Sequence, residues 1–200
     1  TTAHTQQLMD INPEYAKARA KVNSQTEQWI KDHPNHNEKT IITIPVVVHV
    51  VYNNDDQNIS DAQIQSQIDV ISKDFRGTNS EFPGLQVTWP QAADMEIEFY
   101  LAQIDPDGNP TNGITRTSTS TASWGTSDDL KSTAAGGKDA WDTSLYFNFW
   151  VANLGGGLLG YAQFPGGDPT TDGIAMGYNY FGSSDDDDGS FILSAPFDKG

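Results

Sequence analysis

The sequence predicts an α/β fold, in which a twisted mixed sheet of about five strands is combined with two helices and an N-terminal helical arm. Residues 41–52 form a nearly continuous apolar, β-branched run, which is typical of a strand covered on both faces. Ser60 and Gln63 have the spacing of a helix capping box, and an apolar stripe follows up to Gly77. Residues 95–104 have a strand pattern, so the order strand, helix, strand indicates a βαβ unit. The stripe consists of Ile64, Ile68, Ile71 and Phe75.

A separate helix precedes the sheet. Residues 11–14 have the pattern of a hydrophobic staple, an N-cap, a first-turn proline and a first-turn acid. The helix should end near Asp32, because the residue before Pro34 is disfavoured in helical geometry. We therefore divide the chain into a helical arm, residues 1–37, and a body, residues 38–200. The apolar stripe of the arm helix consists of Tyr15, Ala18, Val22 and Trp29.

Three more strands are predicted after a loop-rich stretch, residues 105–140. Residues 145–152 alternate in polarity and are rich in aromatic side chains, which indicates a core strand. Residues 158–165 follow three consecutive glycines and end in a proline, a combination that favours a strand at a sheet edge. Residues 173–180 are predicted to form the last strand.

The composition excludes several classes of function. The chain has 200 residues, a formal charge of -16 and no cysteine. Such an acidic surface repels phosphate backbones and anionic lipids, so nucleic acid and membrane partners are disfavoured, whereas calcium would be attracted. Without cysteine there are no disulfides, thiolate metal sites or thiol nucleophiles. The abundance of Asn, Asp, Gly, Ser and Thr over Lys suits a secreted, extracellular protein.

The four histidines show no pattern of a metal site. His33 and His36 lie three residues apart in the linker after the arm helix, and His4 lies near the start of the chain. A metal ion needs about three convergent ligands, so we interpret these histidines as solvated. His49 lies inside the predicted buried strand, where we expect a core histidine bonded to a carbonyl.

Three acidic patterns each have a structural and a functional interpretation. Residues 105–109 begin like an EF-hand loop, but Pro110 and Arg116 stand where that loop needs Gly and Glu, so a turn is predicted. Residues 185–188 are four successive Asp, for which a solvated loop is the default and calcium binding the alternative. The third pattern is the alternating set Asp94, Glu96 and Glu98. These carboxylates could line the cleft of a glycoside hydrolase, although a polar strand face is the commoner arrangement.

Several segments in order resemble the pappalysin family of metzincin metallopeptidases, in particular its microbial branch. The resemblance covers residues 40–200, and the preceding arm resembles the end of that family's pro-segment. The most specific stretch contains the sequence Gly-Leu-Leu-Gly-Tyr-Ala at residues 157–162. The matching segments are residues 44–52, 61–70, 73–75, 111–116, 136–165, 171–173 and 178–182.

The resemblance implies a secreted, zinc-dependent metalloendopeptidase that is made as a zymogen. Metzincins hold zinc with the histidines of a His-Glu-x-x-His-x-x-Gly-x-x-His motif, whose Glu polarises the zinc-bound water. This sequence has no histidine after His49, so no residue is assigned as a zinc ligand or as the catalytic Glu. The ligands are expected beyond Gly200, and the chain alone is expected to be inactive. The C-terminal part of the same protein is then the expected partner, as a separate chain.

The resemblance also implies a substrate site and a latency residue. A peptide or protein substrate would add antiparallel to the edge strand through main-chain hydrogen bonds. The family's pro-segment blocks the zinc with a Cys or an Asp, and Asp10 is the candidate here. A catalytically inert peptide- or calcium-binding module is the alternative function, and a glycoside hydrolase is the third. The implied substrate-binding residues are Gly157, Leu158, Leu159, Gly160, Tyr161 and Ala162.

Overall fold

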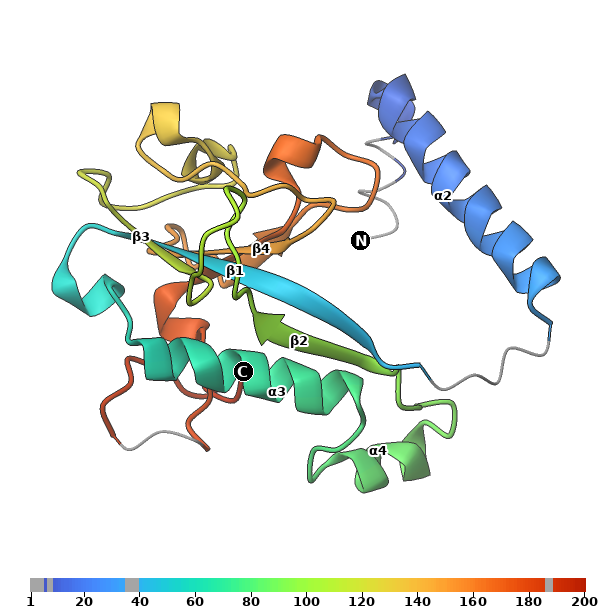
Figure 1. The fold of residues 1–200 in the computed structure, drawn as a ribbon. Helices are drawn as coiled ribbons and strands as arrows, with labels where there is room; N and C mark the ends of the chain where they lie inside the picture. Colours follow the sequence, from blue (N-terminus) through green and yellow to red (C-terminus); the bar gives the residue numbers. More distant parts are fainter. Residues whose placement is uncertain (1–5, 7–8, 35–39, 186–188) are drawn as a thin grey trace.

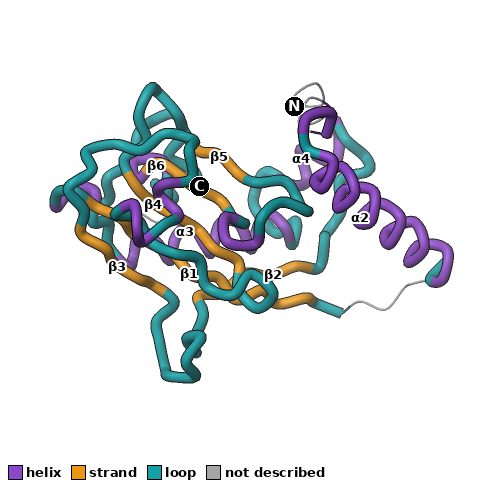
Figure 2. The backbone as a smooth tube through the Cα atoms, turned by 90° about the horizontal axis from the view of Figure 1, so that it is seen from above, coloured by secondary structure: helices purple, strands orange, loops and turns teal. Residues whose placement is uncertain are grey.

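The computed structural model describes residues 6, 9–34, 40–185 and 189–200. Within these residues one mixed sheet has six strands, in the order β2-β1-β4-β6-β5, with β3 also paired to β1 (Figures 1 and 2). β5 is antiparallel to β6, and the other pairings are parallel. The predicted α/β class and mixed sheet are confirmed. The strands are β1 (Ile42–Tyr52), β2 (Ile97–Leu101), β3 (Ile114–Ser118), β4 (Phe147–Ala152), β5 (Gly160–Ala162) and β6 (Ile174–Gly177).

The sixth strand, β3, falls in the stretch that was predicted to be loop-rich. β2 pairs with residues 42–46 of β1, and β3 pairs with residues 48–52 of the same strand. β4 pairs with residues 46–50 of β1, so β2 and β3 share the opposite side of that strand. β3 has a short, polar sequence whose extended conformation is stabilised by pairing with the long neighbour, and its own pattern did not predict this.

β1 is the central strand, and the prediction that both of its faces are covered is confirmed. Val46 and Val48 are fully buried in a cluster with Ile64 and Ile68 of α3 (Asp61–Phe75). Val51 lies in a second cluster with aromatic side chains of β4 and of the loops. Figure 1 shows α3 below the sheet and the loops of residues 119–172 above it. The alternation of β1 side chains between these layers follows from the period of two in a strand.

α3 begins and ends as the sequence predicts. The Ser60 hydroxyl accepts a hydrogen bond from the Gln63 N–H at 3.1 Å, and Gly77 after the helix has a φ of +59°. The apolar stripe is buried at Ile64 and Ile68 and half-buried further along. Three polar residues share the buried face and were not predicted to be there; they are Gln63, Ser66 and Gln67.

These polar side chains attach residues 178–192 to the helix. The side-chain amide of Gln63 donates to the carbonyls of Phe181 at 2.8 Å and Ile192 at 3.0 Å, and its oxygen accepts from the Ile192 N–H at 3.0 Å. Gln67 accepts from the Gly182 N–H at 2.9 Å. Residues 178–192, which have little regular structure, are therefore held to α3 by hydrogen bonds from glutamine side chains to backbone groups. These bonds give the buried backbone N–H and C=O groups their partners.

We expect Gln63→Leu to lower the free energy of unfolding by about 2 kcal/mol, because a side chain of similar size would leave buried backbone groups without partners. Urea unfolding followed by tryptophan fluorescence measures this change. Gln65→Leu is the matched control, since Gln65 lies on the exposed face of the same helix and its side-chain amide donates to Asp69. Equal effects of the two substitutions would contradict the role of Gln63.

The arm helix, α2 (Pro13–Asp32), starts at Asn12, whose side-chain oxygen accepts from the Tyr15 N–H at 3.1 Å. The predicted bounds are confirmed, but the predicted apolar stripe is only partly used. Tyr15 is its one buried side chain, and Trp29 is 49% exposed. Figure 1 shows α2 beside the body rather than against a sheet face, which explains the exposed stripe. None of the described helices is both long and apolar enough to cross a membrane.

The structure also revises several boundaries. The body has a second helix, α4 (Phe82–Thr88), whose position the sequence did not predict. The strands predicted at residues 95–104, 145–152, 158–165 and 173–180 are all shorter in the structure. The last of them ends at β6 because a helical turn, Tyr178–Tyr180, follows at once.

Candidate functional site

The residues implied to bind substrate lie at one edge of the sheet. β5 is the last strand in the sheet order, and within the described residues no strand pairs with its outer side. Gly160 and Ala162 are exposed, and Tyr161 between them is half-buried. Gly157 has a φ of +74° and belongs to the turn before the strand, where a side chain would be strained. Leu158 packs against the second core cluster, and Leu159 is 39% exposed. The predicted edge position is confirmed.

The main-chain groups of β5 point alternately inward and outward. The carbonyl of Leu159 accepts from the Gly177 N–H at 2.8 Å, so Leu159 directs its main-chain groups to β6, and so does Tyr161 two residues further. The N–H and C=O groups of Gly160 and Ala162 therefore point toward the open edge. An extended peptide lying antiparallel to β5 would find these groups without a strand partner.

A buried lysine lies behind the edge strand. The side chain of Lys131 is 1% exposed, and its ammonium lies 2.9 Å from Asp128 Oδ1 and 2.7 Å from the Thr171 carbonyl. The ammonium also lies over the rings of Tyr161 at 4.9 Å and Trp150 at 5.3 Å from their centroids. The carboxylate, the carbonyl and the two rings together offset the loss of water around the charge. The sequence did not predict the burial of this residue, because its partners other than Asp128 are distant in the chain.

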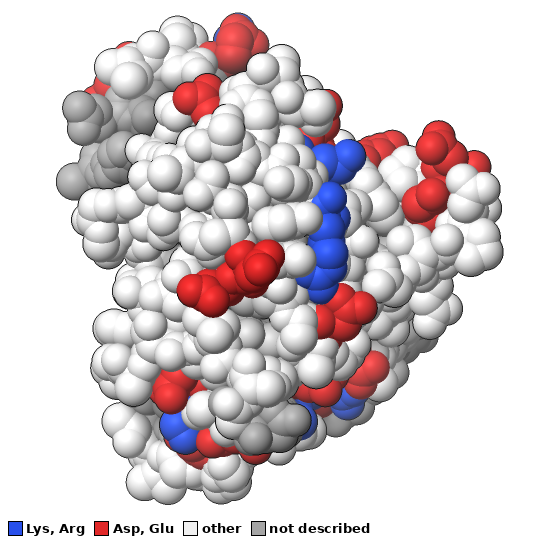
Figure 3. Space-filling view, turned by 90° about the vertical axis from the view of Figure 1, so that its left-hand side faces the viewer, with Lys and Arg blue, Asp and Glu red and all other residues white. Residues whose placement is uncertain are grey.

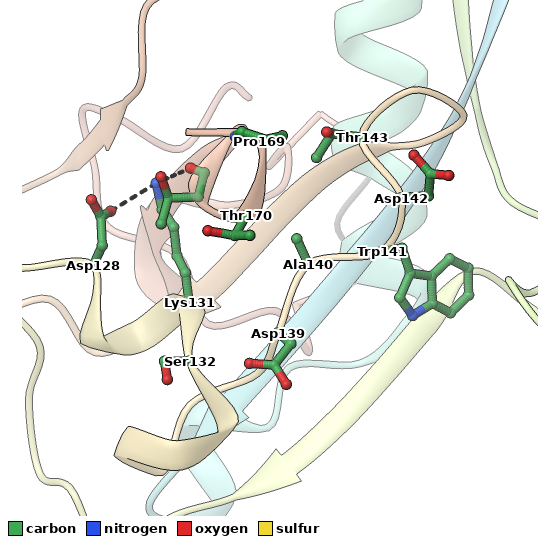
Figure 4. Close-up of a pocket in the computed structure, with 11 residues that line it drawn as sticks. Asp128, Lys131, Ser132, Asp139, Ala140, Trp141, Asp142, Thr143, Pro169 and Thr170 are labelled. Carbon is green, nitrogen blue, oxygen red and sulfur yellow. Dashed lines mark hydrogen bonds and ion pairs between the residues drawn. The ribbon is translucent and has the colours of Figure 1, made fainter. Parts of the chain in front are cut away.

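A cavity of about 440 Å³ adjoins Lys131 and is shown in Figure 4. Asp139 and Asp142 line it, but each carboxylate is held by its own turn. Asp139 accepts from the Thr133 N–H at 2.8 Å, and Asp142 accepts from the Ser144 hydroxyl at 2.6 Å and from the Ser144 N–H at 2.9 Å. These hydrogen bonds lower the pKa of both carboxyl groups.

Among the described residues no group of three or more His, Cys, Asp or Glu side chains is arranged to hold a metal ion. The described residues therefore do not fit a zinc site.

A second cavity, of about 430 Å³, shares Asp128 and Lys131 with the first. It lies at the C-terminal end of β5, where Tyr161 and Ala162 line it. Its other wall comes from the arm and includes Tyr15. The arm thus reaches the region of the edge strand.

His49 is a core residue, as predicted. It is fully buried, its Nε2 lies 3.0 Å from the side-chain oxygen of Asn148, and its Nδ1 lies 2.7 Å from the Thr115 hydroxyl. The carbonyl that it meets therefore belongs to a side chain. Its ring also packs against Trp150 at 5.3 Å. Burial lowers the pKa of His49 from 6.5 to about 4, so the ring is neutral at physiological pH.

The structure gives the other acidic patterns structural roles. Asp94 and Glu98 both form ion pairs with Arg76, so they face a cation rather than a shared cleft. The glycoside hydrolase arrangement is therefore not formed. Asp105 caps a turn by accepting from the N–H groups of Asp107 and Asn109, as predicted. On the face shown in Figure 3 a narrow strip of basic side chains has acidic side chains beside it, and smaller basic patches lie near acidic ones elsewhere on this face.

The arm places its candidate residues at the surface. Asp10 is exposed and accepts from the Gln6 side chain at 2.9 Å. The ring of His33 stacks on Trp29 with a centroid distance of 4.5 Å. The predictions for His4, His36 and residues 186–188 concern positions outside the described residues.

The comparisons with known proteins agree with this fold. No protein-family model and no curated protein sequence matches the chain. A mutant of Tannerella forsythia promirolysin is 44% identical over 98% of this chain and 62% of that chain, with a TM-score of 0.81. Tannerella forsythia mature mirolysin in complex with a cleaved peptide is 49% identical over 80% of this chain and 59% of that chain, with a TM-score of 0.74. Mirolysin in complex with compound 9 is also 49% identical, with a TM-score of 0.71.

Mirolysin is a metallopeptidase, and these solved structures include both its zymogen and its mature form. The present chain spans about three-fifths of the length of these relatives, at 59% and 62% of their chains. Nearly half of the residues in the matched regions are identical to those of these solved relatives. The chain has a mirolysin-like metzincin fold, of the type found in a metalloprotease zymogen.

Proposed function

We propose that this chain is the N-terminal part of a secreted, zinc-dependent metalloendopeptidase zymogen of the pappalysin family. The observation that carries the proposal is the 44% identity to promirolysin across 98% of the chain. Identity at this level over almost the whole chain supports a shared activity, which fold similarity alone would not do.

The arm, residues 1–37, is proposed to be the end of the pro-segment. The promirolysin match covers 98% of this chain and the mature mirolysin match covers 80%. The difference, 18% of 200 residues, is about the length of the arm. The location of the arm beside the C-terminal end of β5 agrees with a segment that covers a peptide site. Asp10 is the proposed latency residue of this segment.

Zinc is proposed to be bound by residues of the longer protein that follow Gly200, because the described residues do not fit a zinc site. The chain alone is then inactive, and its partner is the C-terminal part of the same protein, as a separate chain. Calcium is proposed as a second cation, on the basis of the acidic charge.

Peptide substrate is proposed to add to β5 through the outward groups of Gly160 and Ala162. The turn at Gly157 and the exposed Leu159 extend the same edge toward the start of the strand. This mode of binding uses main-chain hydrogen bonds, so it accepts many sequences, and side-chain pockets beside the strand supply the selectivity.

We expect Ala162→Pro to lower kcat/KM of the full-length peptidase about tenfold, because proline lacks the outward N–H that a substrate carbonyl would accept from. Pairing with β6 does not use this N–H, so the thermal midpoint should change little. Ala162→Val is the control, since it keeps the N–H and adds comparable bulk at the same exposed position. If both variants are equally active, substrate does not pair with β5.

The proposed function is tested on full-length protein. Zinc content, intact mass and hydrolysis of a casein substrate are measured before and after incubation that removes the arm. One zinc per molecule and proteolysis that a chelator abolishes are the expected results. Stoichiometric peptide or calcium binding without zinc and without hydrolysis would overturn the proposal in favour of an inert binding module.

A further inference from the structure

The cavity between the arm and the body, described above, has an unusual polar lining. Tyr15 from the arm and Asp128, Lys131 and Tyr161 from the body line its polar part. Phe164, which is 39% exposed, contributes an apolar wall. The volume of about 430 Å³ lies within the range of sites that accept a small molecule or one large side chain.

Buried polar atoms in this lining lack hydrogen-bond partners among the described residues. They are the hydroxyl of Tyr15, the hydroxyl of Tyr161 and Oδ1 of Asp128. Oδ1 of Asp128 lies 2.9 Å from the ammonium of Lys131, so it has an ion pair but no well-aligned hydrogen bond. Buried polar groups are nearly always hydrogen-bonded in folded proteins, and a cluster of exceptions in one cavity indicates a place where another polar group binds.

Tyr15 is well placed to cover this cavity. It is 8% exposed and is the one buried side chain of α2, so the arm is anchored to the body mainly through it. A second contact lies one turn further, where Ala18 packs so closely on Gly166 that a Cβ on Gly166 would lie 2.8 Å from the Ala18 methyl. These contacts lie in the first half of α2, and Tyr15 belongs to neither core cluster, so release of the arm would open the cavity to solvent without removing a residue of the core.

The cavity is also aligned with the open edge of β5. Side chains directly opposite one another on paired strands lie on the same face, about 5 Å apart at their Cβ atoms. The residue of a bound peptide that lies opposite Tyr161 would therefore direct its side chain to the same face as the Tyr161 ring. That face contains Lys131 and the cavity.

We propose that this cavity is a side-chain subsite for a tyrosine of a bound peptide, and that Tyr15 of the arm covers it in the zymogen. The apolar wall of Phe164 receives the ring, Asp128 accepts a hydrogen bond from the phenol, and the Tyr161 hydroxyl donates one to it. Asp128 has a left-handed φ of +62°, which is uncommon for residues other than glycine, and its carboxylate lies beside Lys131. The proposal rests on the proposed function, because it assumes that peptide pairs with β5.

Burial and the nearby Asp128 and Asp129 raise the pKa of Tyr161, so its hydroxyl remains a proton donor over the physiological range. Lys131 remains buried beneath the Tyr161 ring and holds the Asp128 carboxylate in place. A phenylalanine in the subsite would fill the same space but would leave these polar atoms unpaired. The subsite should therefore distinguish tyrosine from phenylalanine by about tenfold in affinity, the effect of one hydrogen bond to a charged acceptor.

The test measures peptide binding to the full 200-residue chain carrying Tyr15→Ala. The probes are the capped pentapeptides Ala-Ala-Tyr-Ala-Ala and Ala-Ala-Phe-Ala-Ala, titrated by ligand-detected NMR. We expect the tyrosine peptide to bind about tenfold more tightly than the phenylalanine peptide. The unsubstituted chain should bind both at least about tenfold more weakly, because Tyr15 covers the site. Trp29→Ala is the matched control, since it removes an exposed aromatic side chain from the same helix and should leave binding as in the unsubstituted chain.

A second substitution in the Tyr15→Ala background separates the subsite from the edge strand. Tyr161→Phe should reduce the preference for tyrosine, because it removes one of the two hydrogen bonds to the phenol, while the phenylalanine peptide still binds. Ala162→Pro should weaken both peptides equally. Equal binding of the two peptides to the Tyr15→Ala chain, or a preference unchanged by Tyr161→Phe, would overturn the subsite. This binding measurement needs neither zinc nor catalysis. An inactive full-length protein would therefore refute the proposed function, whereas the subsite is judged from peptide binding alone.

Discussion

Gly137→Ala is expected to lower the free energy of unfolding by about 3 kcal/mol, the upper part of the range for an overpacked buried site. A Cβ at this position would lie 2.0 Å from the carbonyl oxygen of Leu130, which is itself 1% exposed. The backbone cannot move aside without loss of hydrogen bonds, because the Gly137 N–H donates to Ser132 and the Lys138 N–H donates to the same Leu130 carbonyl. Lys131 is part of this loop, so its buried ion pair should be disturbed as well.

Chemical denaturation of the variant beside Gly125→Ala measures the effect. Gly125 lies in the same loop layer, a Cβ added to it would meet no heavy atom within 4 Å, and its φ is outside the left-handed region. Its replacement should change stability by less than about 0.5 kcal/mol, as at other open surface positions. A Gly137→Ala chain as stable as the control would mean that the loop adapts without cost.

Acidification should destabilise the chain through His49, by about 3 kcal/mol in total. The pKa of His49 is about 4 in the folded chain against 6.5 for an unperturbed histidine. Between these values the unfolded chain binds a proton that the folded chain does not, so unfolding becomes easier as the pH falls. The stabilisation from the neutral His49 ring is therefore fully present above pH 6.5 and is lost progressively as the pH falls to about 4. About 2 kcal/mol of the loss occurs above about pH 5, where most carboxyl groups remain ionised.

Urea unfolding at several pH values between about 7 and 5 tests this expectation. His49→Gln should remove most of the slope of stability against pH in that window, since glutamine does not titrate. His33→Gln is the control, because His33 is exposed on the arm and contributes no buried imidazole. An unchanged slope in the His49 variant would show that another group is responsible for the pH dependence.

Local patterns were sufficient to predict the regular elements that carry the fold. The β-branched run of β1 predicted a strand buried on both faces, and Ser60, Gln63 and Gly77 predicted the bounds of α3. These signals succeed because capping, helical periodicity and β-branching act within a few residues. The position of residues 158–165 at a sheet edge was predicted in the same way, from glycine and proline.

Partners distant in the chain decided the rest. β3 is a strand because it pairs with residues 48–52 of β1, to which β2 does not extend. Gln63 is buried because its side-chain amide bonds to backbone carbonyls of residues 178–192. Trp29 belongs to the same apolar stripe as Tyr15, yet Tyr15 is buried and Trp29 is 49% exposed. The sequence by itself therefore determined the α/β class, the arm and the edge strand. The tertiary structure alone decided which polar side chains are buried, including Lys131 and Asp128, because the stability of a buried charge depends on groups that only folding brings together.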